Sequence, residues 1–194
     1  MAHIKPFCAV RPNATIASEF SSASIQFYSE EKLNNVLKNN PFSFIQILKS
    51  NLKKIDKNTL DKRYENVKKK YQNFKDKGYL TQDSNPAFYI YEIDDNENSY
   101  CGIIAAASVE DYKNNIIKKH ENTIETREER FKNYLKAVRF NAEPVLLTYK
   151  NSTEISNIID KLKQHKPTVE FSIESNEKHR LWKIDNQKKI IQIQ

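Results

Sequence analysis

The sequence predicts an α+β fold, with a mixed sheet and flanking helices, and three observations support it. Apolar residues recur at helical spacing in residues 59–77, whereas residues 87–93 and 99–108 are apolar runs on either side of a polar turn. Helical and extended patterns are mixed along the chain, as is typical of α+β proteins. With 38% hydrophobic residues among 194, the chain can form a core, and we expect a single domain over residues 1–194.

The N-terminal part is predicted to be extended before its first helix. Residues 3–10 are expected to be extended, and residues 14–24, rich in serine and alanine, to form a loop. Ser29 is a favourable N-cap for a helix that runs to about Lys38. The pair Asn40-Pro41 should end this helix, because the residue before a proline disfavours helical geometry.

A strand is predicted over residues 42–48, and the clearest helix follows over residues 59–77. The helix shows an apolar stripe with spacings of four and three residues, formed by Leu60, Tyr64, Val67, Tyr71 and Phe74. Thr59 is expected to cap its start, and Gly78 to adopt a left-handed conformation after its end. Such a stripe usually packs in a core, so we predict no cofactor site here.

Residues 87–93 and 99–108 predict a β-hairpin around the acidic turn at residues 94–98. Residues 101–107 are small and apolar, so we expect this strand to be buried on both faces at the centre of the sheet. Gly102 would then allow another backbone to approach closely.

The rest of the chain is predicted to contain two helices and further strands. A helix is expected from about Thr123 to Phe140, with a buried stripe of Phe131, Leu135 and Val138. The remaining elements are a strand over residues 144–149, a helix from Ser152 or Thr153 to about Gln164, a strand at residues 169–173, and two short strands within residues 179–194.

Composition excludes several kinds of site. Gly78 and Gly102 are the only glycines, so a glycine-rich phosphate loop is absent and any phosphate must be held by side chains and ordinary backbone amides. Cys8 and Cys101 form no CxxC pair, so neither a zinc site nor a thioredoxin-type site is indicated.

Charge and hydropathy favour an ordinary cytoplasmic protein with reduced thiols. The net charge is +7, but the lysines are scattered, which favours a solvated basic surface over a nucleic-acid interface. No apolar run approaches the ~20 residues needed to span a bilayer. Charged and proline residues within the first eleven positions interrupt any signal-peptide core.

The densest group of reactive side chains lies between residues 118 and 130. It comprises Lys118, Lys119, His120, Glu121, Asn122, Thr123, Arg127 and Arg130. Asn122 or Thr123 is a natural N-cap, so free backbone N–H groups and cations would form an anion pocket with a carboxylate nearby. The alternative is structural: Glu121 pairs with Arg127 or a lysine, and His120 is a partly buried polar residue.

Other candidates carry weaker signals. Three histidines, His3, His165 and His179, share no metal-ligand spacing, and no metal site is predicted. Trp182 beside Arg180 could stack on a ligand, but a place in the core or at a sheet edge is favoured. Cys8 has no histidine partner by motif, which disfavours a thiol nucleophile.

Several short motifs occur together along the chain. They are Ile4-Lys5-Pro6-Phe7, Arg11-Pro12, Asn40-Pro41-x-Ser43-Phe44, Gly78-x-Leu80-x-x-Asp83, Val109-x-Asp111-Tyr112 and the run around His120-Glu121. In this combination the chain resembles the domain-of-unknown-function ten-fifteen family. It departs from the family at residues 24–28, where a Pro-Tyr-Asp-Val segment is usual. It also ends at Gln194, before the family's later Asp-Gly-His-His-Arg motif, so we expect an N-terminal part of a longer architecture.

That later motif looks like the phosphate-gripping motif of ParB proteins and free serine kinases. The resemblance therefore implies a ParB- or sulfiredoxin-like fold when complete, and nucleotide-linked phosphoryl transfer to free serine or a similar metabolite, with Mg²⁺ and ADP or ATP. Glu121 would be the base or metal partner, and His120, Lys118, Arg127 and Arg130 would hold phosphates. Without the later motif, the chain alone is expected to be weakly active or inactive.

Two other functions stay open. One is a non-catalytic module that binds a nucleotide or, less favoured by the scattered charge, a nucleic acid. The other is a structural half that completes a larger site. No membrane partner is indicated, and the sequence does not give the oligomeric state.

Overall fold

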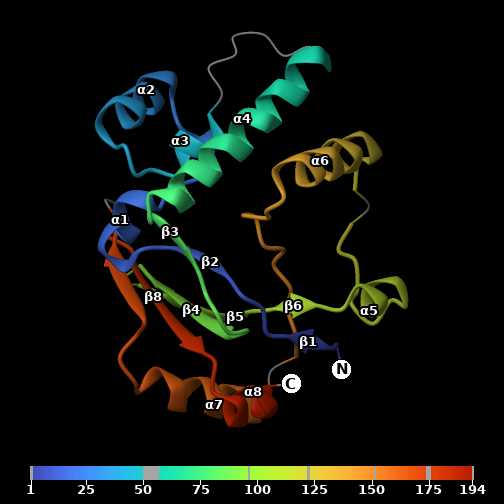
Figure 1. Cartoon of the computed structure of the whole chain (residues 1–194). Helices are drawn as coiled ribbons and strands as arrows, with labels where there is room; N and C mark the ends of the chain where they lie inside the picture. Colours follow the sequence, from blue (N-terminus) through green and yellow to red (C-terminus); the bar gives the residue numbers. More distant parts are fainter. Residues whose placement is uncertain are drawn as a thin grey trace. The chain divides into compact units, whose positions relative to one another are not determined.

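The computed structural model describes residues 2–49, 57–95, 97–121, 123–150, 152–173 and 176–193. It confirms the α+β class, with antiparallel sheets and flanking helices. The chain folds into two compact units, which are described separately (Figure 1). Unit 1 comprises Met1–Ala14, Gln82–His120 and Pro144–Gln194, and unit 2 comprises Thr15–Thr81 and Glu121–Glu143.

Unit 1 is built on a four-stranded antiparallel sheet in the order β5-β4-β8-β7. The strands are β4 (Phe88–Asp94), β5 (Ser99–Ile104), β7 (Val169–Ser172) and β8 (Lys178–Ile184). The predicted hairpin is confirmed, because β4 pairs with β5 from Tyr89 opposite Ile104 to Asp94 opposite Ser99. A separate pair joins β1 (Ile4–Lys5) to β6 (Ala106–Ala107).

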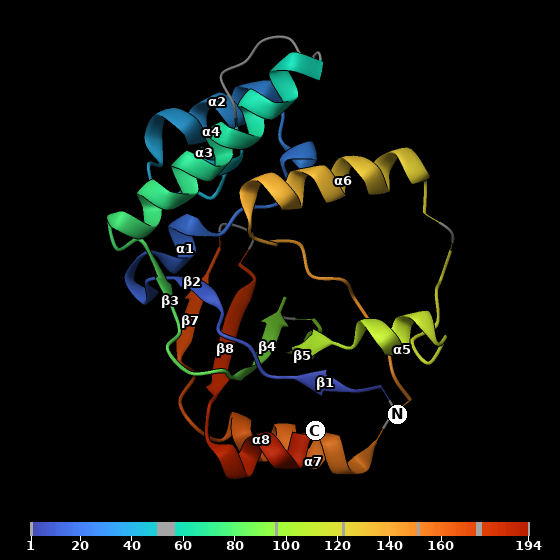
Figure 2. The same cartoon turned by 45° about the vertical axis from the view of Figure 1, so that its right-hand side comes forward.

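Two helices of unit 1, α7 (Thr153–Lys163) and α8 (Gln187–Ile193), pack against one face of this sheet. Helix α5 (Val109–Lys113) follows β6 and lies to the side of the sheet (Figure 2). Figures 1 and 2 show α7 and α8 side by side beneath the strands. The core between them consists of Phe88, Ile90, Leu162, Trp182, Ile184 and Ile190. The helix predicted from Ser152 or Thr153 is confirmed as α7, and Ser152 is its N-cap, since its hydroxyl accepts the N–H of Ile155 at 3.4 Å.

Of the two strands predicted within residues 179–194, one is confirmed as part of β8 and the other is wrong. Residues 187–193 form α8, because Asn186 accepts the N–H groups of Lys188 and Lys189 and so starts a helical turn. Residues 101–107 are not at the sheet centre: β5 is an edge strand, and Ser99 to Gly102 are exposed. No described atom lies within 4 Å of the position that a Cβ would take at Gly102, so the expected close approach of another backbone does not occur among the described residues.

The predicted strand at residues 144–149 is also wrong. These residues pair with no strand, although their sequence is β-prone. Val145 is 81% exposed and Leu146 is 90% exposed. The apolar run indicated an extended backbone but could not show whether another strand pairs with it, because strand pairing depends on residues distant in sequence.

Unit 2 is helical. Its elements are η1 (Ala14–Ile16), α1 (Ala17–Phe20), η2 (Ile25–Phe27), α2 (Glu30–Asn39), α3 (Ile45–Leu48), α4 (Lys57–Asp76) and α6 (Glu125–Val138). Strand β2 (Val10–Pro12) lies in unit 1, and β3 (Leu80–Gln82) falls at the boundary between the units.

The helix signals of unit 2 are largely confirmed. Ser29 caps α2 by accepting the N–H of Lys32 at 3.2 Å, and Gly78 has a φ of 71° after α4. Since α4 begins by Lys57, Thr59 lies inside the helix and is not its N-cap. Aromatic side chains join α4 to residues around α6: Tyr71 stacks on Phe140 with ring centroids 4.2 Å apart.

Two segments of unit 2 were predicted wrongly. Residues 14–24 contain the short helices η1 and α1 rather than a loop. Residues 42–48 contain α3 rather than a strand, because Asn40 accepts the N–H groups of Phe42 and Ser43 and bends the chain into a helical turn. A short apolar run has no clear periodicity, so the two structures could not be separated by pattern.

The helix near residue 125 is shorter than predicted. It spans Glu125–Val138, and Val138 is 1% exposed whereas Phe131 is 43% exposed. Only the C-terminal part of the expected stripe is therefore deeply buried. Among the described residues, no helix combines the length and apolar character needed to cross a bilayer.

Matched leucine substitutions test the core of unit 1. Leu162 is 7% exposed and Leu146 is 90% exposed. We expect Leu162→Ala to lower the free energy of unfolding by about 2–5 kcal/mol, through lost transfer free energy and a cavity. Leu146→Ala should change it by less than about 0.5 kcal/mol. Urea denaturation measures both, and equal losses would contradict the assignment of α7 to the core.

Candidate functional site

The boundary between the two units falls within the reactive cluster predicted from the sequence. Lys118 and His120 belong to unit 1, and Glu121 begins the second segment of unit 2. The other described members on the unit 2 side are Thr123, Arg127 and Arg130. Asn122 lies outside the described residues. Each half of the cluster is therefore described within its own unit.

Every described member of the cluster is exposed. This holds for Lys118, His120, Glu121, Thr123, Arg127 and Arg130. The structural alternative required a partly buried His120 and, in one form, an ion pair between Glu121 and Arg127. His120 is exposed instead, and no ion pair joins those two described residues. Their polar groups are open to solvent and to a ligand.

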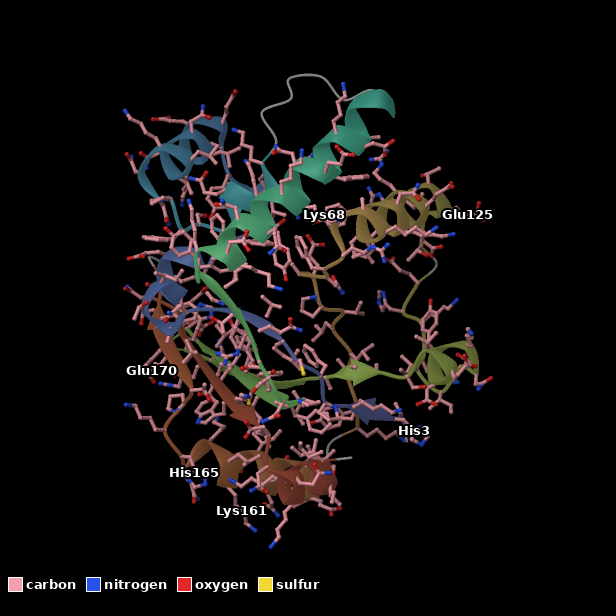
Figure 3. The ribbon with its side chains drawn as sticks, viewed as in Figure 1. His3, Lys68, Glu125, Lys161, His165 and Glu170 are labelled. Carbon is pink, nitrogen blue, oxygen red and sulfur yellow. The ribbon has the colours of Figure 1, made fainter. Side chains whose placement is uncertain are left out.

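The start of α6 differs from the expectation for an anion site. The N-cap is Ile124, which has no side chain that can accept a hydrogen bond, so the prediction of Thr123 as N-cap is wrong. The Thr123 hydroxyl donates to the carboxylate of Glu128. Figure 3 labels Glu125 at this end of the helix. Glu125 and Glu128 already place negative charge in the first turn, where the helix dipole favours it.

Lys119 has a defined position beside α5. Its ammonium group lies 4.9 Å from the centroid of the Tyr112 ring, a cation–π geometry. Helix α5 is capped by Ser108, whose hydroxyl accepts the N–H of Asp111 at 3.2 Å. Among the cations of the cluster, Lys119 therefore has a protein contact that Lys118 lacks within the described residues.

Asp111, part of the Val-x-Asp-Tyr motif, has a structural role. It is 5% exposed and accepts the backbone N–H of His3 at 2.6 Å. The His3 imidazole Nδ1 lies 3.0 Å from the same carboxylate oxygen. The backbone hydrogen bond from His3 and the imidazole contact lower the pKa of Asp111. This contact holds the start of the N-terminal strand against α5, and Figure 3 labels His3 just before β1.

A second motif carboxylate, Asp83, is the centre of a partly buried polar network in unit 1. Arg11 donates two hydrogen bonds to it, at 2.8 and 2.7 Å, and the Tyr89 hydroxyl donates a third at 2.7 Å. Lys183 Nζ lies 3.3 Å from the same carboxylate. Hydrogen bonds from Arg11 lower the pKa of Asp83 to about 2, and burial raises the pKa of Tyr89 to about 12.

A third carboxylate, Glu92, lies in the interior on β4. Arg180, directly opposite on β8, donates to it at 2.7 Å, and Lys163 of α7 forms an ion pair with it. Arg180 also binds Glu170 on β7 at 3.0 Å. Burial opposes ionisation of Glu92, but the hydrogen bonds from Lys163 and Arg180 outweigh it and lower the pKa. These charges join three strands and a helix.

Sequence reasoning missed both carboxylate networks. Asp83 and Arg11 each belong to a short motif of the sequence, and this motif membership could have marked them as important. Glu92 belongs to no such motif.

His179 is also buried. Its Nδ1 lies 2.7 Å from the Tyr91 hydroxyl, and burial lowers the pKa of His179. The described residues contain no group of three or more acidic, histidine or cysteine side chains suited to a metal ion.

The comparisons identify a family but not an activity. A family model described as "Protein of unknown function (DUF1015)" matches residues 4–194. Neither a curated protein nor a solved structure matches the chain.

Acid stability tests the Asp83 network. The pKa of Asp83 is about 2 in the folded chain, against 3.8 for the ordinary side chain. Its ionised form therefore stabilises the fold above about pH 4, and this contribution is lost as the pH falls toward 2. We expect Asp83→Asn to lower the free energy of unfolding at pH 7 by about 3 kcal/mol. The variant should also decline less steeply than the parent between pH 4 and 2 in urea denaturation.

Asp185 provides the matched control. It is an exposed carboxylate that pairs with Lys183 at 3.1 Å. Asp185→Asn should cost less than about 1 kcal/mol, as for a surface ion pair. A steeper acid decline in Asp83→Asn than in the parent would contradict the role of Asp83.

Proposed function

The chain belongs to the DUF1015 family of proteins of unknown function, and within it we propose a part in nucleotide-linked phosphoryl transfer to a small hydroxyl metabolite. The observation that carries the proposal is the exposure of every described residue of the cluster at 118–130. Free serine is the acceptor that the resemblance to free serine kinases implies. The residues themselves require only an alcohol.

The cations of the cluster support phosphate binding. Lys118, Arg127 and Arg130 are exposed, and within the described residues none of them has an ion-pair partner. Arg127 and Arg130 are three positions apart on α6, so their side chains are neighbours on the helix surface. Guanidinium groups bind phosphate oxygens in a bidentate manner, which fits the phosphates of ADP or ATP.

Glu121 and His120 supply the acid–base chemistry. In the proposed reaction with ATP, the Glu121 carboxylate takes the proton of the acceptor hydroxyl. The hydroxyl oxygen of the acceptor then bonds to the γ-phosphorus, the bond between that phosphorus and the β–γ bridging oxygen breaks, and ADP leaves. His120 donates a hydrogen bond to a phosphate oxygen. Mg²⁺ in such sites is usually held by phosphates, water and one or two carboxylates, so Glu121 would be a protein ligand of the ion only in the alternative in which it does not act as the base. When bound, the ion would neutralise phosphate charge.

The same exposure favours a second candidate, a nucleotide-binding module without transfer. In this segment the Glu128 carboxylate is bonded to the Thr123 hydroxyl, so it is not free to act as a base. Nucleotide binding without transfer would support this candidate. Binding to nucleic acid instead should weaken steeply with salt, because phosphate contacts release counterions.

Nucleotide binding is tested with paired arginine substitutions. We expect Arg127→Gln with Arg130→Gln to weaken ATP binding at least about tenfold in calorimetric titration with Mg²⁺, because charge-assisted hydrogen bonds worth about 1.5 kcal/mol each are lost. Lys132→Gln with Lys136→Gln removes the same charge from exposed positions of α6 and should change affinity by less than about threefold. If both double variants lost the same ATP affinity, the loss would reflect the change in net charge, and the proposed contacts of Arg127 and Arg130 with the phosphates would be contradicted.

Catalysis is tested at Glu121. With ATP and serine, Glu121→Gln should slow phosphoserine formation by about 10²–10⁴-fold, the usual contribution of a general base, while ATP affinity stays within about threefold. Glu129→Gln, an exposed neighbour on α6, is the control and should keep the parent rate. Full activity of Glu121→Gln would remove Glu121 from the mechanism.

A further inference from the structure

We propose that unit 1 carries a separate anion site, in a hollow between β8, α8 and the end of α7, which binds a small phosphate monoester. The hollow has a volume of about 240 Å³ and is lined only by residues of unit 1. Figure 3 labels His165, one of its lining residues, just beyond α7. The inference does not depend on the cluster at 118–130 or on phosphoryl transfer.

The charge of the lining is positive and only partly compensated. Lys166, Lys183 and Lys189 all line the hollow, whereas Asp185 is its acidic residue. Lys183 is paired with Asp83 at 3.3 Å and with Asp185 at 3.1 Å. In the described part of the chain, neither Lys166 nor Lys189 has an ion-pair partner. An anion bound in the hollow would be attracted by the positive charge of both side chains.

Two neutral side chains of the lining have donor groups that are left free by their own hydrogen bonds. The Asn186 carbonyl oxygen accepts the N–H of Lys188 at 3.0 Å and that of Lys189 at 3.4 Å, which leaves the amide NH₂ to donate. The Thr168 hydroxyl oxygen accepts the N–H of Lys183 at 3.0 Å, which leaves its proton to donate. Donors together with unpaired cations select a ligand that is rich in acceptors, as phosphate is.

The floor of the hollow is apolar. Trp182 and Leu162 line it and are 6% and 7% exposed. The Trp182 indole N–H donates to the His165 carbonyl at 2.8 Å, so the ring is held in place and presents carbon atoms rather than a polar group. An ester with a short apolar portion would contact this floor. The volume lies below the ~300 Å³ at which pockets for drug-sized ligands begin, which favours a small ester over a whole nucleotide.

Fluorescence offers a direct assay, because Trp182 is the only tryptophan of the chain. We expect phenyl phosphate to change the emission saturably, and inorganic phosphate to bind more weakly because it makes no contact with the floor. Lys189→Gln should weaken phenyl phosphate binding about tenfold, for one lost charge-assisted hydrogen bond. Lys166→Gln should act in the same direction.

The matched control is Lys188→Gln, which removes the same charge from the neighbouring position of α8 that does not line the hollow. It should leave affinity within about twofold, and all variants should keep the thermal midpoint of the parent. The absence of a saturable response, or equal losses for Lys188→Gln and Lys189→Gln, would overturn the proposal. Binding that persists with Arg127→Gln and Arg130→Gln separates this site from the cluster.

Discussion

Burial of β4 on both faces is the constraint on which unit 1 depends. Phe88 and Ile90 are fully buried against α7, α8 and β8, and Tyr89 between them is 1% exposed. The Tyr89 hydroxyl accepts the N–H of Ala9 and donates to Asp83, so this residue connects the sheet to the N-terminal segment. A strand with β-sheet partners on both sides and packing on both faces leaves its register little freedom. The positions of Glu92 and its cationic partners follow from that register.

The sequence predicted those elements whose signals are local. Helix α4 has a stripe repeated over several turns, the β4–β5 hairpin has a polar turn, and Ser29 and Ser152 are strong N-caps. Local signals failed at residues 42–48, where capping by Asn40 turned an apolar run into a helix.

The polar networks could not be predicted because their partners are distant in sequence. Arg11 and Asp83 are 72 positions apart, and Glu92 and Arg180 are 88 positions apart. The exposure of His120 and Glu121 could not be predicted for the same reason, because it depends on which distant parts of the chain pack near them. A motif identified Asp83 and Asp111 as notable, yet the structure gives both a clear part in holding the N-terminal segment. The structural carboxylates have partners within the protein, whereas Glu121 has no ion-pair partner among the described residues. In the same way Lys183 is paired with Asp83, whereas Lys166 and Lys189 have no ion-pair partner in the described part of the chain.

The extended apolar segment at residues 144–149 has a consequence for how the chain is degraded. Proteases bind their substrates as extended, exposed backbone, and chymotrypsin-like enzymes cleave after leucine and tyrosine. Leu146 and Tyr149 meet both conditions, since they are 90% and 62% exposed in a segment with no strand partner. Hydrolysis there would cut the covalent link before α7, yet β8 would still pair with β4. The nicked protein would thus keep its sheet in native buffer and separate into two fragments only in denaturant.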